Sequence, residues 1–229
     1  MLQRQLEKLW RVAQTSGTGL WMCVAFCVAL ALAVIVLTAL GTGERGTSIA
    51  LQLTGRLSLL LFWPAYAGSA TAALFGPRFG ILAKRGPDFG LAYASAQLVH
   101  VSLVVHIVSM SGRLSLESIM PFFAVGVLWT YLLALSSVER VTKLFTPGFW
   151  RVLRCIGLEY LALVFFVDLV LQPIGNHFRH LLAYLPFSVL IILGSILRMT
   201  AMVKRSGPFR FAPRSLPAHL QQSPRLGAE

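Results

Sequence analysis

Charged residues are scarce in this chain, and acidic residues are the scarcest of them. Charged residues make up 12% of the 229 residues, and eight acidic residues stand against 20 basic ones. Soluble domains usually carry about twice that share of charge, roughly 25%. Hydrophobic residues make up 56% of the chain and its mean hydropathy is +0.73, so the composition excludes an ordinary soluble domain.

Cysteines and catalytic motifs are scarce as well. The chain has three cysteines, Cys23, Cys27 and Cys155, all in or beside apolar stretches. We interpret them as small membrane-facing or packing residues and expect neither a disulfide nor a metal site. The sequence contains no phosphate-binding loop, dinucleotide fingerprint, nucleophile elbow or zinc-protease motif. No enzyme class is therefore indicated by a motif.

Long apolar runs dominate the sequence instead. A helix needs about 20 apolar residues to cross a hydrocarbon core of roughly 30 Å. The runs here are continuous rather than alternating, which favours helices over a barrel. We therefore predict an all-α, polytopic integral membrane protein, a six-helix bundle with spans at about residues 20–40, 48–75, 89–110, 119–137, 152–174 and 181–203.

The two ends of the chain differ in character from this transmembrane domain of residues 20–203. Residues 1–19 are predicted to form a cytoplasmic amphipathic arm, because apolar residues recur there at helical spacing opposite charged ones. The first span is too long for a signal peptide and no clear cleavage site follows it, so we expect an uncleaved anchor. Residues 204–229 are basic and contain four prolines, which predicts a disordered cytoplasmic tail.

The basic residues are distributed unevenly over the two sides of the predicted membrane. Three of them, Arg45, Arg113 and Arg179, lie in loops on one side, and Arg56 lies within a span. The other sixteen lie on the opposite side or at its helix ends. Because cytoplasmic loops collect Lys and Arg, both termini are expected in the cytoplasm, and in a bacterium the membrane is the inner one. The net charge of +12 then reflects contact with anionic lipid in the bilayer, not binding to nucleic acid.

Ionisable residues inside the predicted spans are the candidate functional residues, because such groups are costly in lipid. His100 lies ~16 Å along the third predicted span, near mid-membrane. It suits a heme ligand, a proton relay or a hydrogen-bonded packing residue. His106 follows six residues later, ~120° further round the helix, so the two cannot ligate one heme iron together.

Four further charged residues are predicted to form two pairs inside the membrane. Arg56 and Asp168 lie at similar depths from the outer side, and Glu159 and Arg198 lie at similar depths from the cytoplasmic side. An unpaired charge in the bilayer is unfavourable, which favours pairing of Arg56 with Asp168 and of Glu159 with Arg198. The alternative for the two arginines is extension of their long side chains to the headgroups.

Short motifs in the first half of the chain resemble the ferric reductase-like transmembrane family. These are LTGR at 53–56, then an apolar helix and a basic loop, then FGLAYA at 89–94 and His100. In that family, which includes the heme-bearing membrane subunit of the bacterial methionine sulfoxide reductase system, a heme-ligand histidine follows ten residues after a glycine at the helix start. Here His100 follows ten residues after Gly90.

A later segment is similar to the start of the family's second heme helix. It reads FWRVLR at 149–154 and is followed by Gly157 and Tyr160. The resemblance therefore covers about residues 50–172. It implies the family fold, a heme b with His100 as an axial ligand, and an oxidoreductase membrane subunit that carries electrons. A separate cytoplasmic reductase or a periplasmic partner would then be needed.

The chain departs from the family at the second heme helix. The first family histidine of that helix falls on Arg154, and the second falls near Val167 or Asp168. Arginine stays protonated and cannot serve as an ordinary heme ligand. The fold is therefore better supported than the activity.

Three interpretations stay open at this point. The first is a membrane electron carrier with at most one heme at His100, or with an outer site built from His106 and either His177 or His180. The second is a heme-free structural or partner-binding membrane protein of the same fold. The third is a small transporter with Glu159 and Asp168 as cation sites, although the sequence has no internal repeat.

The uneven distribution of basic residues yields a topology prediction. An alkaline phosphatase fused to the C-terminal tail should be inactive, because that enzyme needs disulfides that form only outside the cytoplasm. The same reporter placed in the loop that holds Arg45 should be active. An active fusion at the tail would contradict cytoplasmic termini.

Overall fold

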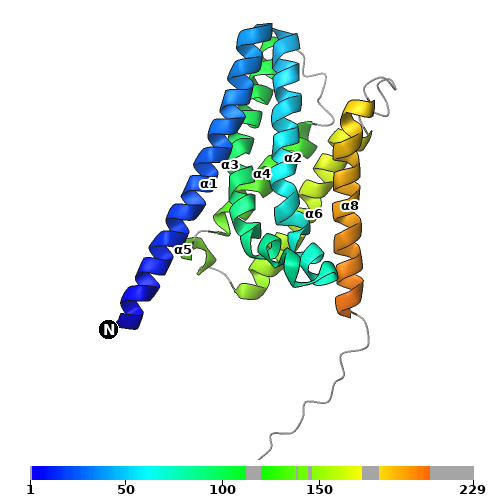
Figure 1. The fold of residues 1–229 in the computed structure, drawn as a ribbon. Coiled ribbons are helices and arrows are strands. Elements are labelled where there is room, and N and C mark those ends of the chain that lie inside the picture. Colours follow the sequence, from blue (N-terminus) through cyan, green and yellow to red (C-terminus); the bar gives the residue numbers. More distant parts are fainter. Residues whose placement is uncertain (1, 112–119, 138, 144–145, 172–180, 207–229) are drawn as a thin grey trace, which may run out of the picture.

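The computed structural model describes residues 2–111, 120–137, 139–143, 146–171 and 181–206, and all regular structure in these ranges is helical (Figure 1). The long helices are α1 (Leu2–Leu40), α2 (Glu44–Phe75), α3 (Gly80–Ser111), α4 (Met120–Leu135), α6 (Pro147–Phe166) and α8 (Leu181–Ser206). Shorter helical segments are η1 (Pro77–Phe79), α5 (Glu139–Thr142) and the π-helix η2 (Val167–Leu171). The prediction of an all-α fold is confirmed.

Four segments are long and apolar enough to cross a membrane, and they indicate a multi-pass membrane protein. They are Gly17–Leu40, Glu44–Phe75, Pro77–Met110 and Tyr184–Lys204. The two remaining predicted spans coincide with α4 and with α6 and η2. The described part of α4 is apolar but has only 16 residues, and α6 carries Arg151, Arg154 and Glu159. Length and charge therefore separate these two helices from the other four.

Several predicted boundaries fall inside observed helices. The predicted arm and first span form one helix, α1, because an internal glycine such as Gly17 or Gly19 costs only about 1 kcal/mol and does not end a helix. α3 begins at Gly80, nine residues before the predicted start at 89, and continues through Pro87. α2 likewise continues through Pro64. Of the predicted tail, residues 207–229 lie outside the described residues.

α1, α2 and α3 pack through a seam of alanines. Ala25, Ala29 and Ala33 recur every four residues on one face of α1 and are buried against alanines of α2 and α3. Lipid tails are as apolar as these side chains, so helices associate in a membrane by close van der Waals packing and hydrogen bonds. Small residues permit that close approach. The Ser95 hydroxyl of α3 adds a hydrogen bond to the carbonyl of Met22 on α1, at 2.9 Å.

α2 also packs against α3, α6 and α8 through aromatic rings. The ring of Phe62 lies 5.3 Å from that of Tyr66, 5.4 Å from that of Tyr93 and 5.2 Å from that of Phe165. Trp63 turns toward α8, where its indole Nε1 donates to the carbonyl of Leu190 at 2.8 Å. α2 therefore contacts the helices on both sides of the bundle.

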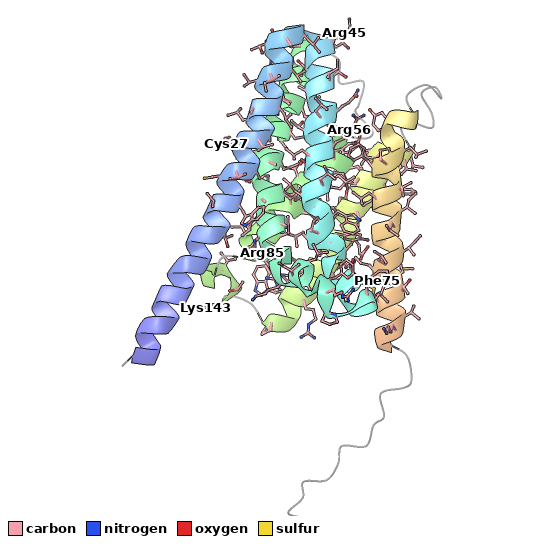
Figure 2. All side chains as sticks on the ribbon, in the orientation of Figure 1. Cys27, Arg45, Arg56, Phe75, Arg85 and Lys143 are labelled. Carbon is pink, nitrogen blue, oxygen red and sulfur yellow. The ribbon has the colours of Figure 1, made fainter. Side chains whose placement is uncertain are left out.

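Both ends of the described chain lie at one end of the bundle. In Figure 1, α1 and α8 form the two lateral edges, and the start of α1 and the end of α8 point the same way. Figure 2 shows Arg45 at the opposite end from Arg85 and Lys143. The fold thus separates Arg45 from these two basic residues, as the sequence analysis expected.

Gly68 of α2 is a test of the close approach between α2 and α3. A Cβ atom at Gly68 would lie 2.9 Å from the backbone oxygen of Leu82, which cannot move aside as a side chain can. Gly68→Ala should therefore destabilise the protein, by about 1–3 kcal/mol, as overpacking usually does. The measurement is the thermal unfolding of purified protein in detergent.

Gly90→Ala is the matched control on the partner helix. A Cβ atom at Gly90 would meet the Cβ of Ala65 at 3.8 Å, an ordinary contact. Because alanine favours a helix over glycine by up to about 1 kcal/mol, this variant should be neutral or slightly more stable. Equal stability of the two variants would show that the helices are not in close contact at Gly68.

Candidate functional site

His100 lies at the interface between α2 and α3. Its Nδ1 is 3.0 Å from Oγ1 of Thr54, and that hydroxyl also lies 2.9 Å from the carbonyl oxygen of Ala50. A threonine has one hydroxyl proton, so when it is donated to Ala50, His100 donates from Nδ1 and its Nε2 carries the lone pair. The imidazole lies against Gly55 of α2, where a Cβ atom would be 3.4 Å from Cε1 of His100.

Of the other candidate heme histidines, one lies in the described part of the chain. His106 is exposed near the C-terminal end of α3. His180, with its neighbour His177, lies outside the described residues. Within the described ranges, no three His, Cys, Asp or Glu side chains come together as a metal site. The three cysteines are free and exposed, and Cys27 points away from the bundle (Figure 2).

Arg154, which stands where the resembling family has a histidine, binds the end of α4. Its Nη2 donates to the carbonyl oxygen of Ser136 at 2.8 Å, and its Nε donates to the hydroxyl of Ser136 at 3.2 Å. The last carbonyls of a helix lack partners within the helix, so this guanidinium caps α4. The described residues therefore do not fit a heme held between two histidines, because the second helix supplies a cationic cap instead of an imidazole.

Glu159 and Arg198, one of the two predicted charge pairs, are brought together between α6 and α8. Nε of Arg198 lies 2.8 Å from Oε1 of Glu159. The side chain of Arg198 is 12% exposed and that of Glu159 is 46% exposed, so the pair lies at the rim of the packed interior.

Tyr66 of α2 joins this pair to a third helix. Its hydroxyl donates to Oε2 of Glu159 at 2.9 Å, and its backbone oxygen accepts from Nη1 of Arg198 at 3.0 Å. The guanidinium of Arg198 also lies 4.6 Å from the centre of the Tyr66 ring. Tyr66 is 1% exposed. Sequence reasoning missed this residue, since a tyrosine within an apolar run gives no sign of the direction in which its hydroxyl points.

Arg56 and Asp168, the other predicted pair, form no ion pair in the described part of the chain. The guanidinium of Arg56 lies 5.1 Å from the ring centre of Tyr184 and 5.3 Å from that of Phe187, both on α8. A cation over aromatic faces is stabilised without a counter-ion. Asp168 lies in η2, so similar depth did not bring the two charges into contact.

A cavity of about 200 Å³ lies between α2, α3, α4 and α6. Its walls include Phe62, Ala65, Leu133 and Leu161, and Arg154 is among its lining residues. The cavity is at the end of the bundle where α4 ends and α6 begins, the end predicted to be cytoplasmic. It had no signature in the sequence, because its walls come from four helices that are far apart along the chain.

Comparisons with protein-family models, with curated proteins and with solved structures gave no match. The resemblance to the ferric reductase-like family therefore rests on the short motifs alone.

The contact between Glu159 and Arg198 predicts energetic coupling. Replacing either residue by glutamine leaves the other without its charged partner, whereas the double substitution removes both charges. The sum of the two single losses of stability should therefore exceed the loss in the double variant by about 1 kcal/mol, which is within the range for residues in contact. Thermal unfolding of the four proteins in detergent measures this difference.

Arg151→Gln is the matched control for that cycle. Arg151 is exposed on α6, two turns before Glu159. Combined with Glu159→Gln, it should give additive losses. Coupling of the same size in this control cycle would mean that net charge, and not the contact, is responsible.

Proposed function

We propose that the chain is a heme-free, multi-pass membrane protein with six spans that serves as a structural or partner-binding component of the membrane. The observation that carries this proposal is that the polar side chains of α6 bind neighbouring helices. Where the resembling family has a ligand histidine, α6 has Arg154, which is bound to Ser136. Five residues further along the same helix, Glu159 is bound to Arg198. The polar groups of this helix are used to hold helices together.

The arrangement of the helices supports six spans with cytoplasmic termini. α6 and η2 together cover 25 residues, from Pro147 to Leu171, which is about 37 Å of helix. α4 and α6 pack against each other within the bundle. With both of them crossing, an even number of spans puts the start of α1 and the end of α8 on one side, as in Figure 1. In a bacterium this is the inner membrane, with the lipid bilayer as the immediate partner.

A single-heme electron carrier is the second candidate, and one observation favours it. The hydrogen bond between His100 and Thr54 engages Nδ1 of the imidazole and not Nε2. Histidines that bind a metal usually have this arrangement, with the far nitrogen fixed by a hydrogen bond. Such a carrier would also require a cytoplasmic reductase or a periplasmic partner. A transporter is less favoured, because both carboxylate oxygens of Glu159 already have donors.

A reduced-minus-oxidised absorption spectrum separates the two candidates. We expect no Soret band from the purified full-length protein, even from cells supplied with a heme precursor, because His100 has no opposing imidazole among the residues that the structure describes. His100→Ala and His106→Ala are measured beside the wild type. A band that is present in the wild type and in His106→Ala, and absent in His100→Ala, would overturn the heme-free proposal in favour of the single-heme carrier.

A further inference from the structure

The cavity between α2, α3, α4 and α6 is held open by small residues. Ala65 of α2, Ala83 and Gly86 of α3 and Ala134 of α4 line it, and its larger wall residues include Phe62 and Leu133. At about 200 Å³ it is smaller than the sites of roughly 300–1,000 Å³ that hold drug-sized ligands. A cavity of this volume can hold only part of a flexible hydrocarbon chain.

Three polar side chains of the wall have hydrogen-bond partners within the bundle. The hydroxyls of Tyr93 and Thr130 are 3.2 Å apart, and Thr130 also donates to the carbonyl of Gly126 at 3.0 Å. The hydroxyl of Ser136 donates to the carbonyl of Leu133 at 2.6 Å. A buried water needs two to four polar partners. Because these groups are already engaged, the inner wall offers dispersion contacts to a hydrocarbon chain more readily than hydrogen bonds to water.

Arg154 supplies a fixed positive charge beside the apolar space. Ser136 accepts hydrogen bonds from Nε–H and from one N–H of Nη2. Three of the five guanidinium N–H groups are therefore left for an anion. The two bonds to Ser136 also hold the guanidinium in place before any ligand arrives, which reduces the entropy lost on binding. Arg154 lies seven residues, or about 10 Å, from the start of α6, a depth close to the boundary between headgroups and acyl chains.

The surrounding charge is also positive. Lys84 and Arg85 lie between the lining residues Ala83 and Gly86 on α3, and Arg85 is at the same end of the bundle as Lys143 (Figure 2). Asp88, the acidic residue nearest to them in sequence, accepts a hydrogen bond from Thr18 on α1 at 2.8 Å. An anionic group is therefore favoured at this opening over a cationic or neutral one.

We propose that this cavity binds an anionic phospholipid of the surrounding leaflet, with the phosphate at Arg154 and part of one acyl chain between the four helices. The proposal goes beyond the proposed function and does not depend on whether heme is bound. Phosphate suits a guanidinium, which can donate two parallel hydrogen bonds to it. The bilayer supplies the ligand at the same depth as the cavity.

Mass spectrometry of the intact, detergent-solubilised full-length protein tests the proposal. Dioleoyl phosphatidylglycerol, dioleoyl phosphatidylcholine and oleate are added separately at equal concentration. We expect retention of phosphatidylglycerol over phosphatidylcholine, and binding about tenfold weaker in Arg154→Gln, which corresponds to the loss of one charge-assisted contact. Ala134→Leu, which fills the apolar space and keeps Arg154, should also weaken binding.

Arg151→Gln is the matched control, because it removes the same charge from the same helix one turn away and outside the cavity wall. It should bind phosphatidylglycerol like the wild type. An equal loss in Arg151→Gln, or equal retention of both phospholipids, would overturn the proposal in favour of unspecific attraction. Retention of oleate alone would overturn it in favour of a fatty acid. Should Arg154→Gln fail to fold, unchanged binding by Ala134→Leu would overturn it independently.

Discussion

A polar group that enters a bilayer must find its partner within the protein, and in this chain α2 supplies many of those partners. Thr54 forms a hydrogen bond with His100 of α3, and Trp63 forms one with the backbone of α8. Tyr66 binds the charged groups of both α6 and α8. These three contacts lie along one helix and reach three others. The positions of α3, α6 and α8 are therefore coupled through α2, and a change in its register would break all three contacts at once.

The two sides of α2 use different packing. Toward α1 and along part of α3 the contacts are made by alanines, which bring helix backbones close together, although Tyr93 of α3 also contacts the Phe62 ring. Toward α6 and α8 they are made by aromatic rings and by the group of Glu159, Tyr66 and Arg198. Small residues fit only when the backbones are near, whereas rings keep the helices further apart. The cavity lies where these two kinds of packing meet, with Ala65 and Phe62 both in its wall.

The helical class of the fold could be predicted from this sequence, whereas rotation about the helix axes could not. Apolar length identified the helices, and the 25 residues of α6 and η2 coincide with most of one predicted span. Matching depth identified Glu159 and Arg198, whose side chains also face each other. The same argument paired Arg56 with Asp168, but Arg56 points to Tyr184 and Phe187 on α8. The depth of a residue depends on its position along one helix. The direction in which its side chain points depends on how several helices pack.

The boundaries that were missed have a local cause. The predicted arm ended at residue 19 and the third predicted span began at about residue 89, but Gly17, Gly19 and Pro87 all lie within α1 and α3. A single glycine costs a helix about 1 kcal/mol, and a bilayer adds a strong preference for any backbone whose hydrogen bonds are internal. Signals that end helices in water are therefore weaker in a membrane protein.

Arg154 connects the departure from the family pattern with the cavity. Its guanidinium reaches both the carbonyl and the hydroxyl of Ser136 and still borders the open space. A histidine at this position has a shorter side chain and at most two N–H groups, so it could not cap α4 in this way and also ligate an iron. Replacing Arg154 by histidine would thus leave the end of α4 without its donor and remove the fixed positive charge from the cavity. The arginine is an integral part of this bundle, because it holds the end of α4 and also borders the cavity.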